Sequence, residues 1–380
     1  MRLTITSGRA VEMDVIIVHY HAAASVCEAV SALRQDASES NMLLNIVVAD
    51  NGSTSQEWAA LQSLGVVYLN TGWNAGYAGA VNIAFPATRS EWIVLMNEDV
   101  IVLPGCLRAL QDALRRGAAV VGPEFYWDRD CRFRLPCTEE RTRRNELLKV
   151  AGKRSLTKLE RSRNEWRQHA RRHWRSRNPM PTTALSGALL AFRRDTWNAV
   201  GPFDDEFPLY FEENDWLFRV ARAGLQCLFI PGAKAIHLHN PILARTPERL
   251  QMQARSFIRF GNRYYGERFL QRLFLLSSCE GVIPDWPKAE GTAIHLDAAE
   301  ACVWPLWVEL TPSSSGFPAA TTCITDPKTE WWSLPTMRGL DFVEGTLYLQ
   351  VVDDIGRELC HYSFERKVRS SSQHRQTVAV

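Results

Sequence analysis

Residues 92–99 read Trp-Ile-Val-Leu-Met-Asn-Glu-Asp, an apolar run that ends in three polar residues. A short apolar run of this length, rich in large aliphatic side chains, is typical of a strand that is buried on both faces. Asn97, Glu98 and Asp99 would then follow the carboxyl end of that strand. In open α/β sheets, ligands bind at this edge. The segment therefore predicts a buried strand and a polar site at its end.

The sequence around this segment alternates between short apolar runs and helical patterns. The runs expected to form strands are 15–18, 45–49, 66–69 and 92–96. The helical patterns between and after them are 22–34, 56–64, 76–85 and 107–115. Such alternation predicts an α/β fold with a Rossmann-like, mostly parallel sheet and helices on both faces.

Polar clusters follow three of the expected strands, at 19–21, 50–53 and 97–99. Turn chemistry could account for each cluster alone, because Asp, Asn, Gly and Ser are common turn residues. Three clusters at equivalent strand ends favour a ligand site over three unrelated turns.

The size and composition of the chain are those of a globular protein with two domains. The chain has 380 residues and a net charge of +2. Its 9 cysteines are scattered without a C-x-x-C pair, which argues against a disulfide framework or a structural zinc site and for a reducing compartment. Charged residues interrupt the first apolar stretch, and no apolar run is long enough to cross a bilayer. We expect a cytoplasmic protein.

The segment 128–178 is strongly basic and is expected to be a helical insertion. Leucine, alanine and tryptophan residues recur in it at nearly helical spacing, at Leu156, Leu159, Trp166, Ala170 and Trp174. Two interpretations stay open: this face packs on the main domain, or residues 141–177 hold the protein on an anionic membrane surface. The segment carries no recognised nucleic-acid motif, so nucleic-acid binding is not expected.

A change in pattern marks the end of the first domain. Gly281, Pro284 and Pro287 interrupt the sequence, and the helical period does not return after them. We expect a main domain at 1–280 and a small β-rich, sandwich-like accessory domain at 285–380. Its expected strands are 303–310, 321–325, 345–352 and 359–364.

Four segments together resemble the family 2 glycosyltransferases of the GT-A fold, in the branch that includes bacterial rhamnosyltransferases. The segments are 15–21 with 48–53, 70–82, 92–100 and 186–239. Their order and spacing carry the likeness, which spans roughly residues 14–275. The resemblance implies an inverting enzyme that uses a nucleotide-sugar donor.

The resemblance also implies a divalent metal, Mg²⁺ or Mn²⁺. A nucleotide diphosphate is a strongly anionic leaving group, and a cation or fixed donors must stabilise its charge. Residues 97–99 are similar to the family's D-x-D-type motif, which makes Asp99 the metal-binding carboxylate and Asn97 a contact to the donor sugar or ribose. His237 matches the family's histidine near the metal or diphosphate. Asn97 stands where the motif has its first Asp, which leaves a single metal carboxylate.

The donor is expected to bind along two other segments. Asp50 is similar to the family's base-binding aspartate. Residues 72–82 resemble its loop rich in Asn and Gly, where small residues let backbone N–H groups approach a diphosphate. The resemblance makes Asn74, Gly76 and Asn82 donor-binding residues.

The acceptor side is expected around residues 211–216, Phe-Glu-Glu-Asn-Asp-Trp, which resemble the family's E-D-x-D segment. An inverting transfer needs a base beside the acceptor hydroxyl. Glu213 aligns with that base, although the family usually has Asp there, and Asp215 is the second expected catalytic residue. An acidic helix N-terminus stabilised by the helix dipole explains the same residues and does not exclude catalysis.

The sequence therefore predicts a hexosyltransferase that moves a sugar from a dTDP- or UDP-linked donor to a hydroxyl of a glycan or lipid-linked acceptor. The expected context is bacterial surface polysaccharide biosynthesis, at the inner face of the membrane. Two alternatives stay open. One is a non-catalytic carbohydrate-binding protein with a degenerate transferase domain. The other is a sugar-phosphate nucleotidyltransferase, which normally needs a Gly-rich loop after the first strand, where this chain has His-Tyr-His-Ala-Ala-Ala at 19–24. The sequence leaves the oligomeric state open.

Overall fold

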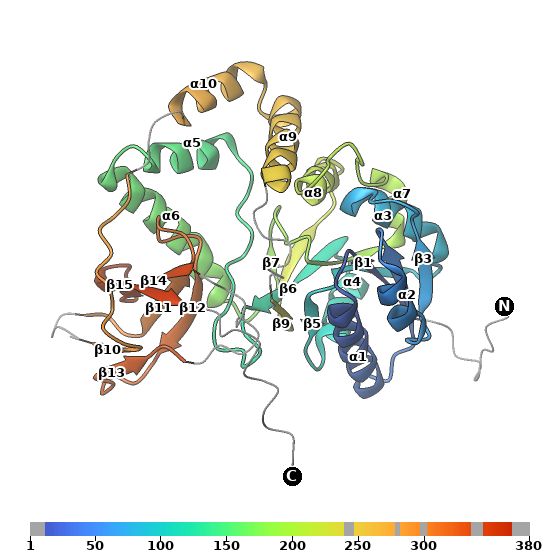
Figure 1. The fold of residues 1–380 in the computed structure, drawn as a ribbon, viewed down its shortest axis with the longest axis horizontal. Helices are drawn as coiled ribbons and strands as arrows, with labels where there is room; N and C mark the ends of the chain where they lie inside the picture. The colour runs from blue at the N-terminus through green and yellow to red at the C-terminus, as the bar shows by residue number, and fades with distance from the viewer. Residues whose placement is uncertain (1–11, 239–246, 278–281, 297–301, 336–344, 367–380) are drawn as a thin grey trace, which may run out of the picture.

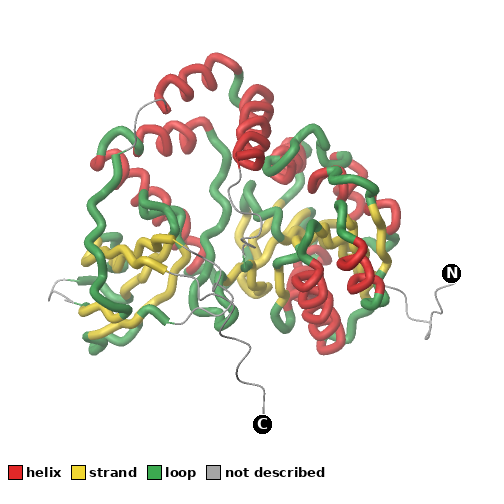
Figure 2. The backbone as a smooth tube through the Cα atoms, in the orientation of Figure 1, coloured by secondary structure: helices red, strands yellow, loops and turns green. Residues whose placement is uncertain are grey.

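The computed structural model describes residues 12–238, 247–277, 282–296, 302–335 and 345–366 (Figure 1). A large sheet on one side and a smaller sheet on the other are joined by helices that arch over the top (Figures 1 and 2). Within the described part of the chain, no helix is both long and apolar enough to cross a membrane.

The large sheet has nine strands, with β3-β2-β1-β4-β8-β6-β9-β5 as its order and β7 paired to β9. The strands are β1 (Met13–His19), β2 (Leu44–Asp50), β3 (Val67–Asn70), β4 (Trp92–Asn97), β5 (Val100–Val102), β6 (Val120–Tyr126), β7 (Met180–Pro181), β8 (Leu189–Arg193) and β9 (Cys227–His237). All four strands expected in the N-terminal third are present. The α/β class is confirmed.

Parallel pairing is concentrated in one half of this sheet. β3, β2, β1 and β4 are all parallel, as the alternation predicts. Beyond β4 the sheet becomes mixed: β8 is antiparallel to both β4 and β6, and β6 is parallel to β9, while β5 and β7 run antiparallel to β9. The expected mostly parallel order therefore describes the N-terminal half, and the sheet as a whole is mixed.

Helices cover both faces of the large sheet. Along β1, Val15 and Ile17 point to one face, where they pack with α1 (Ala23–Glu39) and α4 (Cys106–Arg115). Ile16 and Val18 point to the other face, which is covered by α3 (Gly76–Ala84), α7 (Arg194–Val200) and α8 (Glu212–Arg222). Side chains alternate across a strand, so one buried run serves two cores. α2 (Ser55–Gln62) adds Leu61 to the first core.

Four further helices form the arch between the two sheets (Figure 1). They are α5 (Arg143–Gly152), α6 (Leu156–Trp174), α9 (Pro247–Tyr264) and α10 (Glu267–Ser277). α9 and α10 form a hairpin whose inner side packs on the start of α8, through an aromatic cluster that includes Phe211, Phe260 and Tyr265. Both α5 and α6 lie within the basic segment 128–178.

The C-terminal part of the chain forms a separate antiparallel sheet, which confirms the expected all-β unit. Its order is β12-β11-β14-β15, from β11 (Leu306–Thr311), β12 (Ala320–Ile324), β14 (Gly345–Val352) and β15 (Glu358–Arg366). A two-stranded ribbon of β10 (Ala293–His295) and β13 (Trp331–Ser333) packs against it.

Helix α6 buries its tryptophan face against this C-terminal sheet. Trp174 stacks on Trp307 of β11, with ring centroids 5.8 Å apart, and Trp166 lies in the same cluster. The Arg167 Nε donates to both oxygens of Glu309 at 2.9–3.0 Å, and both side chains are buried. The interpretation of 141–177 as a membrane-binding face is wrong for this side of α6, because its aromatic residues are covered by protein. We propose that α6 belongs to the C-terminal unit although it precedes it in the chain.

Candidate active site

The three polar clusters predicted at strand ends lie at one edge of the large sheet. In the register of the parallel strands, His19 pairs with Asp50 and Val18 pairs with Asn97. Asp50 in turn pairs with Asn70, which begins the loop rich in Asn and Gly. The sequence-predicted donor residues are therefore brought to a common edge by the parallel register of β1, β2, β3 and β4.

Asp50 is fully buried at this edge, and both of its carboxylate oxygens accept hydrogen bonds. Its Oδ1 accepts from the Ser53 amide at 2.9 Å and the Ser53 hydroxyl at 2.5 Å, and its Oδ2 accepts from the Tyr68 hydroxyl. Burial, followed by the neighbouring Asp50, raises the pKa of Tyr68 above its ordinary value, so Tyr68 stays a proton donor. Asp50 is a fixed acceptor whose orientation is set before any ligand arrives.

His19 carries a buried imidazole beside Asp50. From the sequence, it was expected only as a member of the polar cluster at residues 19–21. Neither of its ring nitrogens has a hydrogen-bond partner among the described residues. Burial lowers the pKa of His19 despite the nearby Asp50, so the ring is neutral near pH 7. A buried polar group without a partner is uncommon in folded proteins, which makes this ring a candidate ligand contact.

The loop rich in Asn and Gly is hydrogen-bonded to Asn51, the residue that follows β2. The Asn51 side chain accepts from the Ala75 amide at 2.6 Å and donates to Asn74 Oδ1 at 2.9 Å. Asn74 Oδ1 also accepts from the Gly76 amide at 3.1 Å. Gly76 has a φ of 72°, a left-handed conformation that favours glycine, and a Cβ there would approach the Pro208 carbonyl to 3.5 Å.

Asn82 has a different role from the donor contact that the sequence predicted. Its amide donates to the Phe203 carbonyl at 3.0 Å and accepts from the Phe203 amide at 3.2 Å. Both ends of the side chain are used to hold the backbone ahead of the acidic segment. Asn82 therefore stabilises the loop at Phe203, ahead of the acidic segment.

The turn at 97–99 brings Asp99 beside His237. The backbone N–H of Asn97 donates to the Ala188 carbonyl at 2.9 Å, which anchors the turn. Val100 of β5 pairs with His237 of β9. The Oδ1 of Asp99 lies 3.5 Å from the Nε2 of His237. The two residues predicted to hold a metal are thus neighbours, although 138 positions separate them in the sequence.

Asp99 and His237 fit a divalent metal only if other ligands complete its shell. Among the described residues, no group of three or more His, Cys, Asp and Glu side chains could hold a metal ion. Burial, followed by the charge of Asp99, raises the pKa of Glu98 to about 8, so Glu98 is mostly neutral at pH 7. One carboxylate and one imidazole remain. Mg²⁺ and Mn²⁺ are commonly bound by one or two carboxylates plus substrate phosphates, which matches this donor set.

The acidic segment starts with two residues in strained backbone conformations. Tyr210 and Phe211 have φ values of 61° and 72°, in the left-handed region that non-glycine residues avoid. Strain of this kind costs on the order of 1–3 kcal/mol per residue and is often found at functional sites. Here it turns α8 so that its first residues, Glu212 and Glu213, are directed into the protein.

Glu213 lies against the backbone of residue 187. A Cβ at Gly187 would come within 3.0 Å of the Glu213 Cγ, so only glycine leaves room for this side chain. Asn214 donates to Glu213 Oε1 at 2.7 Å. The other oxygens of the pair, Oε2 of Glu213 and Oε2 of Glu212, are buried and have no hydrogen-bond partner among the described residues.

The two glutamates differ in their electrostatic surroundings. Burial, followed by the neighbouring Glu213, raises the pKa of Glu212 well above its ordinary value. Burial also raises the pKa of Glu213, but the Arg141 guanidinium opposes this rise. Two adjacent carboxyls rarely ionise together, and Arg141 favours Glu213 as the one that does. Arg141 reaches the site from the helical insertion and lies 4.8 Å over the Phe211 ring.

Tyr77 lies where the loop rich in Asn and Gly meets the acidic segment. Its hydroxyl donates to the Gly187 carbonyl at 3.2 Å. Burial raises the pKa of Tyr77, and the charges of Glu212, Glu213 and Glu98 raise it further. From the sequence, Tyr77 was expected only as a member of the loop at residues 72–82. Nothing in local sequence could have placed it between three carboxyls from two other elements.

Asp215 has a structural role, where the sequence predicted a catalytic one. It is fully buried and accepts from Arg219 Nε at 2.9 Å, from Arg263 Nη1 at 2.6 Å and from the Tyr264 hydroxyl at 2.7 Å. These contacts engage both oxygens and join α8 to α9. We propose that they give Asp215 its structural role.

Comparison with known proteins gives the same family along much of the chain. The model of glycosyl transferase family 2 matches residues 14–180. Two relatives, from Mycobacterium tuberculosis strains CDC 1551 / Oshkosh and ATCC 25618 / H37Rv, are N-acetylglucosaminyl-diphospho-decaprenol L-rhamnosyltransferases. Each is 30% identical over 219 residues, which covers 54% of this chain and 69% of the relative.

Two solved structures are similar at low sequence identity. A mannosyltransferase from Pyrobaculum calidifontis, in complex with GDP-Man and Mn²⁺, is 16% identical with a TM-score of 0.44, over 70% of this chain and 69% of that one. A glucosyl-3-phosphoglycerate synthase from Mycobacterium tuberculosis, in complex with Mn²⁺, UDP and glucosyl-3-phosphoglycerate, is 17% identical with a TM-score of 0.42, over 66% and 79%.

The structural role of Asp215 can be tested by removing its charge. We expect Asp215→Asn to lower the free energy of unfolding by about 2–3 kcal/mol. This is less than the loss expected when a fully buried ion pair is broken, because Arg219 and Arg263 are both partly exposed. The midpoint of urea unfolding, followed by far-UV circular dichroism, measures this. The control is Asp195→Asn, which removes an exposed carboxylate paired with Arg193 and should change the midpoint little. Equal midpoints for the two variants would contradict the assignment.

Proposed function

We propose a donor class, an acceptor class and a mechanism for this chain from one premise: it belongs to glycosyltransferase family 2 and is a glycosyltransferase. The proposed reaction is an inverting transfer of a sugar from a dTDP- or UDP-linked donor to a hydroxyl of a glycan carried on a lipid. The names of the relatives, which describe a rhamnosyltransferase acting on a diphospho-decaprenol acceptor, support the acceptor class. The proposed context is bacterial surface polysaccharide biosynthesis.

One observation carries the mechanism: the buried Oε2 of Glu213, which has no hydrogen-bond partner among the described residues. A carboxylate oxygen in this state is an acceptor that a substrate hydroxyl would satisfy. Arg141 favours the ionised form of Glu213, and Asn214 fixes its other oxygen at 2.7 Å. Glu213 is therefore poised to take the proton of the acceptor hydroxyl as that oxygen attacks the sugar.

The donor side provides the complementary charge. Asp50, Asn74 and Gly76 would bind the nucleotide and the diphosphate, with Asn97 beside the sugar or ribose. Asp99 and His237 would hold Mg²⁺ or Mn²⁺, which when bound neutralises the developing charge of the diphosphate. A single metal carboxylate makes the metal depend on the donor phosphates for its remaining ligands.

The catalytic role of Glu213 predicts a loss of rate without a loss of fold. Glu213→Gln removes the base but keeps the shape of the side chain, so we expect kcat for sugar transfer to fall by at least about 100-fold. Initial rates with a dTDP- or UDP-sugar and a lipid-linked glycan acceptor measure this. Donor KM and melting temperature should stay near the parent values.

The matched control for this experiment is Asp195→Asn, the same change from carboxylate to amide at an exposed position of helix α7. It should leave the rate unchanged. Full activity of Glu213→Gln would remove Glu213 as the base. A parent protein that is inactive with every donor would favour the non-catalytic carbohydrate-binding alternative.

The charges around Glu213 predict a specific pH dependence. Arg141 lowers the pKa of Glu213, so Arg141→Gln should raise that pKa and move the acidic limb of the kcat–pH profile to higher pH. Glu212→Gln should leave this limb in place, because glutamine mimics the protonated Glu212 beside which Glu213 ionises. A limb that moves with Glu212→Gln but not with Arg141→Gln would contradict the assignment of charges.

A further inference from the structure

Exposed apolar side chains are concentrated on the α9–α10 hairpin and the residues after it. In the described part of the chain, fifteen large apolar residues are exposed, and seven of them lie between positions 250 and 283. They are Leu250, Met252 and Ile258 on α9, Phe274 and Leu275 on α10, and Val282 and Ile283. Single exposed apolar residues are normal, whereas a cluster in so short a stretch is typical of an interaction surface.

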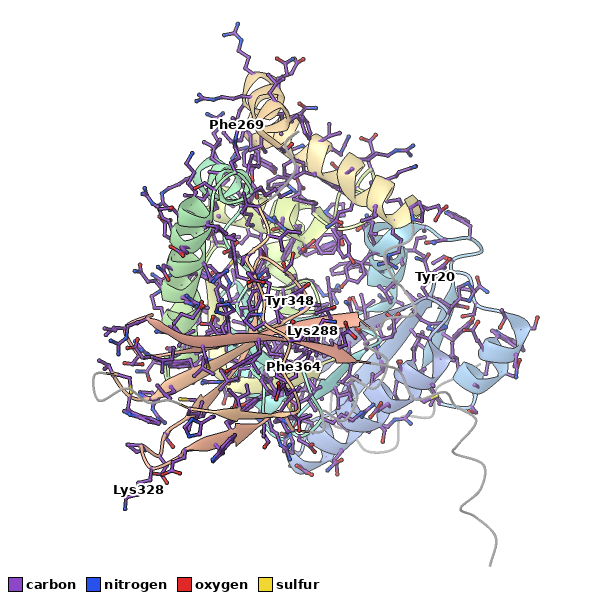
Figure 3. The ribbon with its side chains drawn as sticks, turned by 60° about the vertical axis from the view of Figure 1, so that its left-hand side comes forward. Tyr20, Phe269, Lys288, Lys328, Tyr348 and Phe364 are labelled. Atoms are coloured by element: carbon purple, nitrogen blue, oxygen red, sulfur yellow. The ribbon has the colours of Figure 1, made fainter. Side chains whose placement is uncertain are left out.

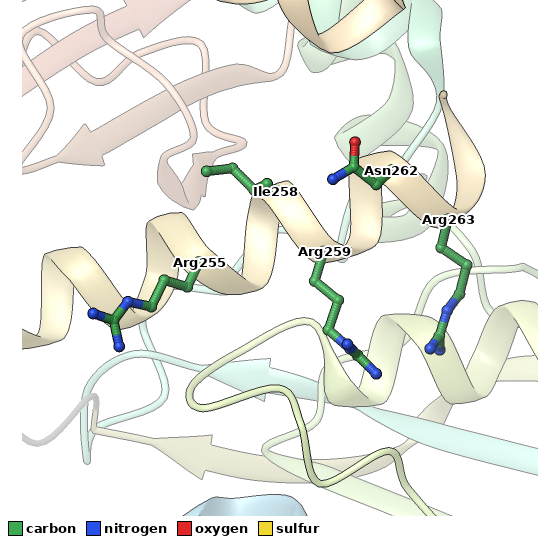
Figure 4. A pocket seen from close by; sticks show the side chains of 5 residues that line it. All are labelled: Arg255, Ile258, Arg259, Asn262 and Arg263. Atoms are coloured by element: carbon green, nitrogen blue, oxygen red, sulfur yellow. The ribbon is translucent and has the colours of Figure 1, made fainter. Parts of the chain in front are cut away.

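Helix α9 packs an aromatic side on the start of α8, and the rest of its surface has a charged side and a side that carries apolar residues. Arg259 and Arg263 point toward the loop ahead of α8, where both bind Asp204, at 2.9 and 2.7 Å (Figure 4). Ile258 and Asn262 point to the opposite side of the helix (Figure 4). Leu250, Ala254 and Ile258 recur every four residues, so they form one stripe along this opposite side.

The charge of the hairpin is complementary to an anionic surface. Residues 247–277 contain six arginines and two glutamates and no lysine or aspartate. Arg255, Arg268 and Arg272 are exposed, next to the apolar residues of both helices. Amphipathic helices of this composition bind at the interface of anionic bilayers, with apolar side chains inserted and arginines on the headgroups.

The hairpin starts at the candidate active site. In the first turn of α9, Arg249 donates to the Tyr210 hydroxyl at 3.3 Å. From there the helices rise to the crest of the molecule, where Phe269 lies far from Tyr348 and Phe364 of the C-terminal sheet (Figure 3). A partner surface that covers these helices would therefore lie next to the candidate active site and would leave the C-terminal sheet exposed.

We propose that the outer face of the α9–α10 hairpin, formed by Leu250, Ile258 and Leu275 with Arg255, Arg268 and Arg272, docks on an anionic lipid bilayer. This docking surface rests on the proposed function, because an acceptor carried on a lipid is presented at the surface of a bilayer. A second copy of the chain is a poorer occupant. A two-fold interface places the same patch on both sides, and here it would bring arginine-rich surfaces together.

The test is sedimentation of the full chain with vesicles. Vesicles of phosphatidylcholine mixed with phosphatidylglycerol should pellet the protein, and vesicles of phosphatidylcholine alone should pellet much less. The apolar variant Ile258→Glu/Leu275→Glu should lower the partition coefficient by at least about tenfold, since it removes inserted side chains and adds negative charge. The charge variant Arg268→Gln/Arg272→Gln should lower it by about fivefold per arginine, the equivalent of about 1 kcal/mol each.

The control variant is Trp331→Glu/Ile355→Glu, which makes the same change at two exposed apolar residues of the C-terminal unit. It should pellet like the parent. Failure of the parent to bind mixed vesicles would overturn the proposal, as would equal losses in the control and the Ile258→Glu/Leu275→Glu variant. A parent dimer that the latter variant splits, seen by light scattering, would assign the surface to a second copy instead.

This test is separable from the proposed function. Stabilisation by a nucleotide diphosphate reports on the donor site and should be the same for all three variants. A protein that binds vesicles but transfers no sugar would refute the proposed reaction and leave the surface standing. A protein that transfers sugar to a soluble acceptor without binding vesicles would refute the surface alone.

Discussion

The buried carboxylate of Asp215 is the contact on which the arrangement of the site depends. It joins the first turn of α8 to the last turn of α9, because Arg219, Arg263 and Tyr264 all bind it. Arg263 also binds Asp204, at 2.7 Å, and so fixes the loop that leads into α8. Glu212 and Glu213 project from the same turn, and the hairpin rises from the other side. One buried ion-pair network thus fixes Glu213, the loop ahead of α8 and the α9–α10 hairpin together.

Burial then decides which carboxyls of the site are charged. Glu98 and Glu212 have raised pKa values and lie beside other acids, so each is disposed to remain protonated near neutral pH. Of the adjacent pair Glu212 and Glu213, Glu213 is the one whose ionisation its surroundings favour. Arg141, supplied by the insertion that leads to the C-terminal unit, contributes to that choice.

Local sequence was sufficient for the strands, their polar ends and the C-terminal sheet, because each depends on short apolar runs and turn residues. It did not by itself place Asp99 beside His237: the resemblance to family 2 glycosyltransferases implied that pairing, and His237 is the last residue of β9. It could not find Tyr77 or Arg141, whose importance comes from carboxyls far away in the chain. It left two interpretations of the tryptophan face of α6 open, and it did not show the arginine partners of Asp215, for a related reason: an acidic turn or an apolar stripe does not reveal its partner. Asn82 was placed in the right loop, but its amide faces the backbone of Phe203.

The central claim is that this edge of the sheet binds a nucleotide diphosphate together with a metal that Asp99 and His237 hold only in part. The most direct measurement is the melting temperature with UDP or dTDP, with Mn²⁺, and with both, for the parent and for Asp99→Asn. Ligand that binds the native state raises the melting temperature. We predict a small effect of Mn²⁺ alone, a large effect of nucleotide with Mn²⁺, and loss of the Mn²⁺-dependent part in Asp99→Asn. Equal stabilisation of both proteins by nucleotide with Mn²⁺, or none in the parent, would contradict the claim.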